Sequence, residues 1–214
     1  MKKLASSFAL ILLAGCAVKP AMLNITTPNA NAGNKVFKIS DARPKKVKES
    51  EWLSLMITSC EYGIRRIGDT DSVPNKMEIL ERDLAEFAPD LLAGKSIQIN
   101  HYTLHLNRAL ALRGQMNSMY GGVIAKSMIN VGCKKDEVSA GWYEATDVSN
   151  VNSPIIVDLA ANVDSKPVKL HFVYSPVVEL TGGFGVKQAD DELLHVFHMA
   201  AKNLIADLEK KATN

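Results

Sequence analysis

Alternating hydrophobic and polar positions predict a chain built largely from strands. A period of two is typical of strands with one buried face. Glycine, proline and aspartate clusters separate these stretches, and residues 164–167 have the composition of a tight turn between the last two. The expected strands therefore cover residues 36–40, 52–58, 96–112, 141–145, 155–159 and 168–180, the last two forming an antiparallel hairpin.

One of these stretches changes its pattern halfway along. In residues 96–112, Ile97 and Ile99 alternate with polar residues, whereas Tyr102 and Leu104 continue the alternation on the other parity. A β-bulge adds one residue to a strand and thereby shifts the faces of all later side chains. We therefore expect a bulge near His101.

A helix is predicted between the early and the late strands. Within residues 74–92 the apolar side chains recur at steps of three and four, which places them on one face of a helix. Pro74 suits a first helical turn, and Pro89 should kink or end the helix.

A second helix is predicted over residues 189–211. Residues 190–192 are acidic and should occupy its first turn, while Lys210 and Lys211 lie in its last. This distribution of charge complements the helix dipole at both ends. The order of elements predicts an α+β fold, with a mostly antiparallel sheet and two main amphipathic helices packed on one face.

The start of the chain carries a targeting signal. Lys2 and Lys3 precede an apolar run from Leu4 to Ala14, which is too short to span a bilayer and is typical of a secretory signal. Leu13-Ala14-Gly15-Cys16 resembles the lipobox of lipoproteins from Gram-negative bacteria. The resemblance implies cleavage before Cys16 and lipid chains on Cys16 as the membrane anchor. The expected organisation is a signal peptide (1–15), a lipidated cysteine with a flexible tether (16–34) and one periplasmic α+β domain (35–214).

Composition and charge indicate where the domain lies in the cell envelope and which partners it has. Residues 17–34 are rich in Ala, Asn, Thr and Pro and cannot bury much apolar area, hence the predicted tether. In the lipoprotein family an aspartate after the lipidated cysteine marks retention in the inner membrane. Ala17 stands there, so the periplasmic face of the outer membrane is expected. Without Lys2 and Lys3 the formal charge of +2 falls to about zero, which gives no basis for a nucleic-acid partner.

Two cysteines remain after Cys16. Cys60 and Cys133 can form one disulfide in an oxidising compartment. The alternative is a pair of free, buried thiols. They form no Cys-x-x-Cys motif, so a redox pair is not indicated.

No residue pattern predicts catalysis. His101 and His105 share a strand face only where no bulge intervenes, and no spacing links them to His171, His195 or His198 as metal ligands. The glycines of residues 181–185 lack the third glycine of a dinucleotide loop and precede carboxylates that repel phosphate, so a tight turn is the better interpretation. We therefore expect no enzyme, no cofactor and no metal.

Two segments have both a functional and a simpler interpretation. Lys45, Lys46 and Lys48 could contact anionic lipid, although three lysines are fewer than the usual lipid-binding cluster and fit a solvated loop. Residues 114–132 contain Met116, Met119 and Met128 and could form a mobile apolar loop that touches lipid or a partner. An ordinary hairpin that turns at residues 121–122 is the alternative.

The order of elements also resembles the YajG-type uncharacterised lipoproteins. The shared features are an early strand that ends near an Asp-x-Arg (Asp41 and Arg43), a helix (74–92), a hairpin strand (168–180) and a closing amphipathic helix (189–211). The resemblance carries no activity. Our first hypothesis is therefore a non-enzymatic lipoprotein of the cell envelope that binds another protein. The alternative is an accessory lipoprotein of a lipid-trafficking system.

Overall fold

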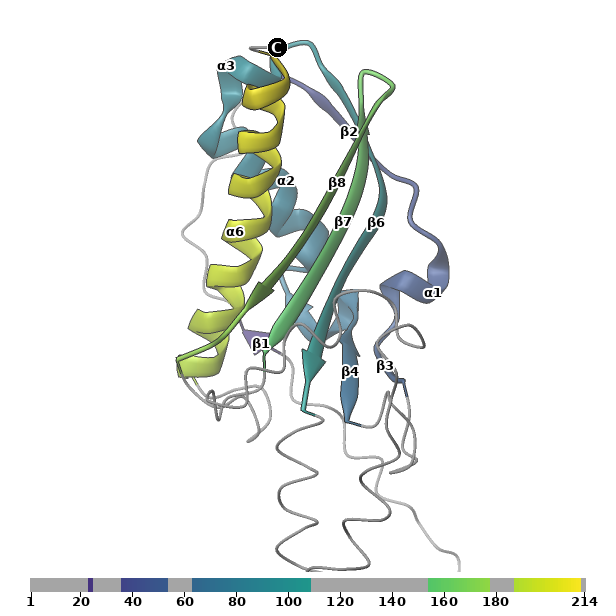
Figure 1. The fold of residues 1–214 in the computed structure, drawn as a ribbon, viewed down its shortest axis with the longest axis vertical. Coiled ribbons are helices and arrows are strands. Elements are labelled where there is room, and N and C mark those ends of the chain that lie inside the picture. Colours follow the sequence, from purple (N-terminus) through teal and green to yellow (C-terminus); the bar gives the residue numbers. More distant parts are fainter. Residues whose placement is uncertain (1–22, 25–35, 54–62, 109–153, 178–186, 213–214) are drawn as a thin grey trace, which may run out of the picture.

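The computed structural model describes residues 23–24, 36–53, 63–108, 154–177 and 187–212. These residues form an α+β fold, as predicted, in which helices cover one face of a mostly antiparallel sheet (Figure 1). The elements are β1 (Leu23–Asn24), β2 (Lys38–Asp41), α1 (Lys45–Lys48), β3 (Glu51–Trp52), β4 (Ile64–Ile67), a 3-10 turn (Asp69–Asp71), β5 (Ser72–Val73), α2 (Lys76–Phe87), α3 (Pro89–Leu92), β6 (Ser96–Asn107), β7 (Ile155–Val163), β8 (Lys166–Tyr174) and α6 (Lys187–Ala212).

The long strand β6 organises the main sheet. On one side it pairs antiparallel with β7, which in turn pairs with β8. On the other side it pairs first with β2, in parallel, and then with β4, antiparallel, and β3 continues the sheet beyond β4. Two short strands therefore share the side of β6 opposite β7.

The predicted bulge is confirmed. The register between β6 and β7 shifts between Ile99 and His101. As a result Ile97 and Ile99, before the shift, and Tyr102 and Leu104, after it, are all fully buried in the core. Because of the extra residue, the apolar side chains at odd positions before the bulge and at even positions after it lie on the same face of the strand.

The predicted hairpin between β7 and β8 is also confirmed. Asp164 and Ser165 form its two-residue turn, with φ angles of 48° and 67°. Two successive positive φ angles characterise the tight turns whose twist matches paired strands. The Asp164 carboxylate accepts a hydrogen bond from the Ser96 amide at 2.9 Å and so fixes the turn to the start of β6.

Both main helices pack on the same face of the sheet (Figure 1). Asn75 caps α2 by accepting hydrogen bonds from the amides of Met77 and Glu78. Leu80 and Leu84 of α2 and Phe197 of α6 are fully buried in a shared core with the inner side chains of β6 and β7. Truncation of one such leucine to alanine costs about 2–5 kcal/mol of stability.

Several predicted boundaries were wrong by a few residues. Pro74 precedes the cap of α2 rather than lying in its first turn, because the side chain of Asn75 takes the capping position. The break at Pro89 was correct: α2 ends at Phe87 and α3 begins at Pro89. Helix α6 begins at Lys187, so that of residues 190–192 only Asp190 lies in its first turn.

The segment expected to be a flexible tether contains an ordered pair of residues. Leu23 and Asn24 form β1 and pair in parallel with Ser72 and Val73 of β5. Composition determines how much side-chain area a segment can bury, whereas this pairing uses main-chain groups. The predicted elements at 114–132 and 141–145 lie outside the described residues, as do residues 54–58 of the strand predicted at 52–58. Of that strand only Trp52 lies in β3, which ends there.

Candidate functional site

The sheet is interrupted on the β2 and β4 side of β6. The pairing with β2 ends at Ile99, and the pairing with β4 begins at Leu104. Within the described part of the chain, no strand pairs with residues 100–103 on this side. The chain leaving β2 and the chain leaving β4 therefore meet beside this interruption.

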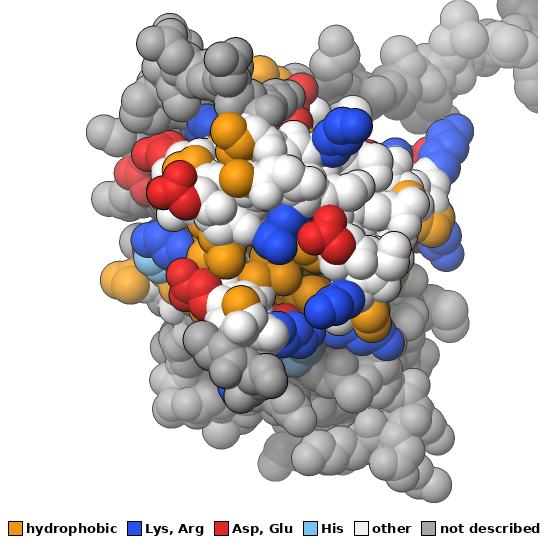
Figure 2. Space-filling view, turned by 90° about the horizontal axis from the view of Figure 1, so that it is seen from above, with side chains coloured by type: hydrophobic (Ala, Val, Ile, Leu, Met, Phe, Trp, Pro, Cys, Tyr) orange, Lys and Arg blue, Asp and Glu red, His pale blue; other side chains and the backbone are white. Residues whose placement is uncertain are grey.

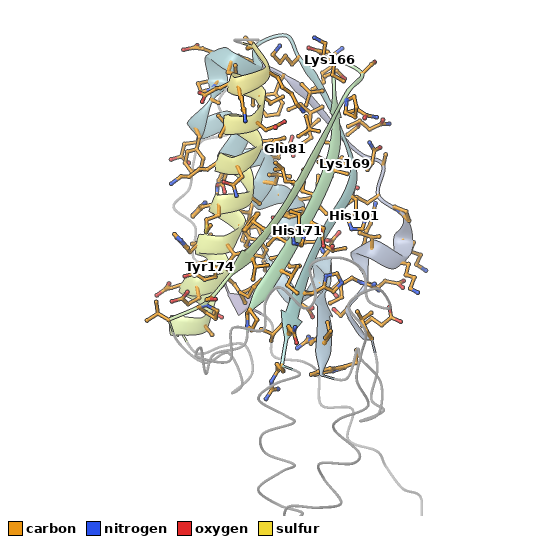
Figure 3. The ribbon with its side chains drawn as sticks, viewed as in Figure 1. Glu81, His101, Lys166, Lys169, His171 and Tyr174 are labelled. Carbon is orange, nitrogen blue, oxygen red and sulfur yellow. The ribbon has the colours of Figure 1, made fainter. Side chains whose placement is uncertain are left out.

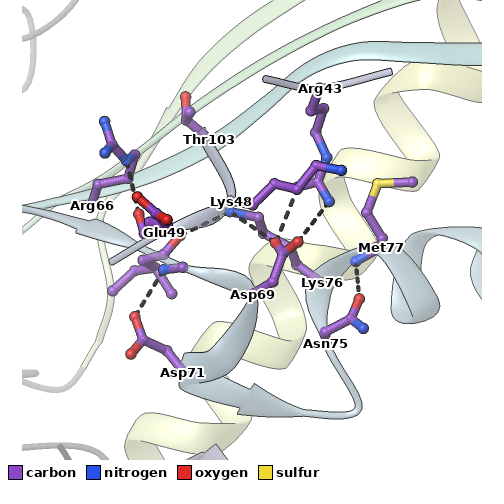
Figure 4. A network of polar contacts seen from close by, with 12 residues as sticks. Arg43, Lys48, Glu49, Arg66, Asp69, Asp71, Asn75, Lys76, Met77 and Thr103 are labelled. Atoms are coloured by element: carbon purple, nitrogen blue, oxygen red, sulfur yellow. Dashed lines mark hydrogen bonds and ion pairs between the residues drawn. The ribbon is translucent and has the colours of Figure 1, made fainter. Parts of the chain in front are cut away.

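Arg43 joins the two chain ends. Its side chain is fully buried, and the guanidinium forms a fork with each of two carboxylates. Toward Asp41, Nε donates at 2.9 Å and Nη2 at 3.0 Å. Toward Asp69, Nη1 donates at 3.1 Å and Nη2 at 2.8 Å (Figure 4). Such paired, charge-assisted bonds are among the strongest polar contacts in proteins.

The acids and bases of this cluster alter each other's ionisation. Burial alone would raise the pKa of Asp41, but hydrogen bonds from Arg43 and Lys48 hold this pKa well below its usual value. Burial alone would lower the pKa of Arg43, yet Asp41 and Asp69 raise it. Asp41 and Arg43 are therefore both charged at neutral pH.

Lys76 completes the cluster from the first turn of α2. Its side chain is fully buried, and Nζ donates to the carbonyl oxygen of Ile67 at 2.8 Å and lies 3.5 Å from Asp69 Oδ1. Burial lowers the pKa of Lys76 to about 8, against the opposing effect of Asp69. We call Asp41, Arg43, Lys48, Asp69 and Lys76 the Arg43 network.

A second buried carboxylate lies next to the network. Asp71 is 2% exposed and accepts hydrogen bonds from the Gly68 amide at 2.8 Å, the Ser50 hydroxyl at 2.7 Å and Arg65 Nη2 at 3.1 Å. A Cβ at Gly68 would lie 2.4 Å from the Ser50 nitrogen, so only glycine fits. Asp69, through Arg43, and Asp71, through Ser50, therefore fasten residues 36–53 to the rest of the fold.

The opposite face of the sheet carries a different set of polar side chains. We call this surface, turned away from α2 and α6, the open face; it is formed by Gln98, His101, Thr103, His105, Asp158, Lys169 and His171. His101 Nε2 lies 3.1 Å from Thr103 Oγ1, and His171 Nδ1 lies 2.7 Å from Asp158 Oδ1. Their common face follows from the strand register, and Figure 3 labels His101, Lys169 and His171 among them.

His101 and His105 do share a face. The bulge precedes both, so they lie opposite Ala160 and Ile156 of β7 with the same orientation. His105 is only 6% exposed, and burial lowers its pKa to about 4. Burial also lowers the pKa of His101. No group of three or more His, Cys, Asp or Glu side chains in the described ranges could hold a metal ion.

The two remaining histidines connect helix α6 to its neighbours. His198 Nδ1 lies 2.6 Å from Oδ2 of Asp83, a fully buried carboxylate that also accepts from Arg82 at 3.0 Å. The His195 ring lies 5.3 Å from the Tyr174 ring, and the Tyr174 hydroxyl donates to Glu192. These contacts hold α6 against α2 and β8.

The end of the molecule that carries the β7–β8 turn has an apolar centre. Seen from this end, hydrophobic side chains gather in the middle of the surface, with charged side chains around them (Figure 2). Leu91 of α3 and Leu208 near the end of α6 are both half-buried against the core. Core side chains thus reach the surface where the helix layer and the sheet layer end.

The residues singled out in the sequence have different outcomes. Cys16, Cys60 and Cys133, the loop at 114–132 and the glycines of 181–185 lie outside the described residues. Of the three lysines considered for lipid contact, Lys45 lies 3.6 Å from Glu49 and Lys48 lies 2.9 Å from Asp41. These two are ion-paired within the domain, which favours the simpler interpretation.

Sequence reasoning missed the Arg43 network, although it noted Asp41 and Arg43. The available signal was the Asp69-Thr70-Asp71 cluster close after Ile64 and Ile67, since a carboxylate that is buried beside a strand needs a basic partner.

No helix in the described residues is both long and apolar enough to cross a membrane. Comparison with known proteins finds no matching family model, no matching curated protein and no matching solved structure.

Proposed function

We propose that this protein is a non-enzymatic lipoprotein, anchored through Cys16 to the periplasmic face of the outer membrane, that binds another protein of the cell envelope. The observation that carries this proposal is Leu13-Ala14-Gly15-Cys16 behind a short basic and apolar leader. Several lipid chains on one residue hold a protein stably at a bilayer, since each buried CH₂ contributes about 0.8 kcal/mol.

The distribution of polar groups supports binding rather than catalysis. A catalytic group must reach its substrate. Arg43, Lys76 and Asp83 have fully buried side chains, and each is held by partners within the domain. Polar groups that solvent can reach, such as those of Gln98, Lys169 and His171, instead lie along the open face, where they can contribute hydrogen bonds to a partner.

Fractionation of cells tests the anchor. Cys16→Ser should move the full-length protein from the membrane fraction to the soluble fraction of a Gram-negative host. Ala17→Asp should move it from outer-membrane to inner-membrane fractions on a density gradient, with Ala17→Ser as the matched control that stays in place. A Cys16→Ser variant that still sediments with membranes would contradict the proposal.

Cross-linking in intact cells tests the partner. A photoreactive amino acid at Gln98, on the open face, should give a discrete adduct with one protein. The same amino acid at Glu86, exposed on α2 on the opposite side of the sheet, is the control. Adducts with phospholipid alone would favour the lipid-trafficking alternative, and absence of any adduct at all exposed positions of the open face would contradict partner binding there.

A further inference from the structure

One side of β8, the last strand of the sheet, faces no strand in the ranges that the structure describes. Strand β8 pairs with β7 along its whole length, from Lys166 opposite Val163 to Tyr174 opposite Ile155. Among the described residues no strand pairs with its other side, which we call the outer edge of β8. An edge strand presents main-chain donors and acceptors that can pair with a further strand.

The turn identifies which main-chain groups point outward. In a two-residue hairpin of this kind the residues that flank the turn, Val163 and Lys166, exchange hydrogen bonds. The pattern then alternates, so every second residue directs its N–H and C=O away from β7. On β8 these outward residues are Pro167, Lys169, His171 and Val173.

Two observations agree with this assignment. Pro167 has no N–H, and its position is one where the ladder with β7 needs none. The Pro167 carbonyl oxygen accepts a hydrogen bond from Lys211 Nζ at 3.3 Å, from α6 rather than from β7. Lys169, His171 and Val173 are left as successive outward donors and acceptors over the middle and end of the strand.

Helix α6 holds this edge strand at both ends. Lys211 bonds to Pro167 at its start, and Glu192 accepts from the Tyr174 hydroxyl at its end. A strand that is already extended loses little conformational freedom when a partner adds to it. The outer edge of β8 is therefore pre-organised for pairing.

The side chains of β8 indicate what such a partner would look like. Leu170, Phe172 and Tyr174 face the helices but are only half-buried, because no further strand of the described residues covers them. Lys169, on the open face, has no ion-pair partner in the described part of the chain, and β8 contains no carboxylate. A complementary strand has apolar side chains toward the helices and acidic side chains toward the open face.

The other edges of the sheet are poorer templates. Strand β3 has two residues and β2 has four, whereas β8 has nine. A second copy of this chain is also a poor occupant, since antiparallel pairing of β8 with itself would bring the basic residues Lys169 and His171 of the two copies together.

We propose that β8 binds an extended segment of the partner protein, with alternating apolar and acidic residues, which adds a strand to its outer edge. This inference rests on the proposed protein-binding function and specifies its surface. Main-chain hydrogen bonds supply affinity in this mode of recognition, and alternate side chains supply specificity.

A synthetic peptide tests the proposal directly. The probe is a capped, fluorescent nine-residue peptide that alternates valine with aspartate or glutamate, titrated into the full-length lipoprotein in detergent and followed by anisotropy. Binding should slow hydrogen exchange at the amides of Lys169, His171 and Val173. A peptide with lysine in place of the acidic residues should bind about tenfold more weakly, since it meets Lys169 with a like charge.

Two variants locate the binding. Val173→Pro removes an outward N–H without removing a bond to β7 and should weaken binding by about tenfold. Lys169→Glu should weaken binding of the acidic peptide and strengthen binding of the basic one. This variant keeps the proposal testable should the proline variant unfold. Lys46→Glu, at an exposed lysine on α1, is the matched charge control and should change neither affinity.

The outcomes separate this inference from the proposed function. Absence of peptide binding, or binding that both β8 variants leave unchanged, would overturn the assignment of β8. A protein adduct in cells would leave the proposed function standing in that event. Dimers that form without peptide and disappear in Val173→Pro would show that a second copy occupies the edge instead, and would equally overturn the proposal.

Discussion

The two sides of strand β6 are built on different principles. Toward β7 the pairing runs from Ile97 to Leu106 with one bulge, and the joined strands share an apolar core. Toward β2 and β4 the pairing is split, and the buried guanidinium of Arg43 bridges the chain ends. One side distributes its stability over many small contacts, whereas the other concentrates it in a few charges. We expect the second side to be far more sensitive to a single substitution.

Removal of Arg43 should have the largest effect. Arg43→Ala removes a buried guanidinium and its four charge-assisted hydrogen bonds to Asp41 and Asp69, which costs about 3 kcal/mol or more in the free energy of unfolding. Urea denaturation measures the loss. Hydrogen exchange should increase first in β2 and β4, while β7 and β8 stay protected.

The control for this change is an exposed ion pair. Lys45→Ala breaks only the contact with Glu49, four residues along, and should cost less than about 0.5 kcal/mol. Equal losses for the two variants, or an Arg43→Ala variant in which all strands exchange together, would remove the distinction between the two sides of β6.

Acid should weaken the protein through His105, on the open face of the same strand. Its pKa is about 4 in the folded protein and about 6.5 when unfolded, so the unfolded chain binds more protons between these values. The contribution of His105 to the free energy of unfolding is therefore complete above pH 6.5. About 3 kcal/mol of it is lost as the pH falls to 4.

His105→Gln should flatten this dependence. Denaturation at several pH values between 4 and 7.5 measures the slope for both proteins. The difference in stability measured at pH 7.5 serves as the reference, because His105 is then mostly neutral in both states and any loss reflects packing alone. If the free energy of unfolding depends on pH in the same way in both proteins, His105 is not the group that makes the protein sensitive to acid.

The smallest effect is expected on the outer strand of the β7 side. Lys169→Ala changes an exposed side chain without an ion-pair partner in the described residues, so the free energy of unfolding should stay within about 0.5 kcal/mol. Urea denaturation checks this value. A larger loss would mean that charge stabilises the hairpin side of β6 as well as the side of β2 and β4.

Much of the fold could be predicted where local pattern and tertiary structure agree. The change of parity at Ile99 indicated the bulge, and Asp164 and Ser165 indicated the turn. The periodicity of residues 74–92 and 189–211 indicated two amphipathic helices. The apolar face expected for the second is buried, whereas the first also buries Lys76 and Asp83 and exposes Phe87. Each of these features depends on residues close together in sequence.

The features that were missed depend on residues far apart. Strand β4 contains Arg65 and Arg66 between two isoleucines, which do not alternate with polar residues in the usual way. Lys76, in the first turn of a helix, would normally lie in solvent and is buried only because Ile67 and Asp69 receive it. The contact between Arg43 and Asp69 spans 26 residues, and neither residue indicates its partner.

The short strand β1 changes how far the domain can stand from a membrane. Leu23 is already paired with Ser72, so only the residues between Cys16 and Leu23 can bridge any gap. The seven Cα–Cα steps from Cys16 to Leu23 span at most about 25 Å when fully extended, compared with about 60 Å for the whole predicted tether. With Cys16 in the bilayer, as proposed, β1 lies within about 25 Å of the lipid surface. The partner of the domain must then be a protein of the same membrane, or one that reaches that membrane.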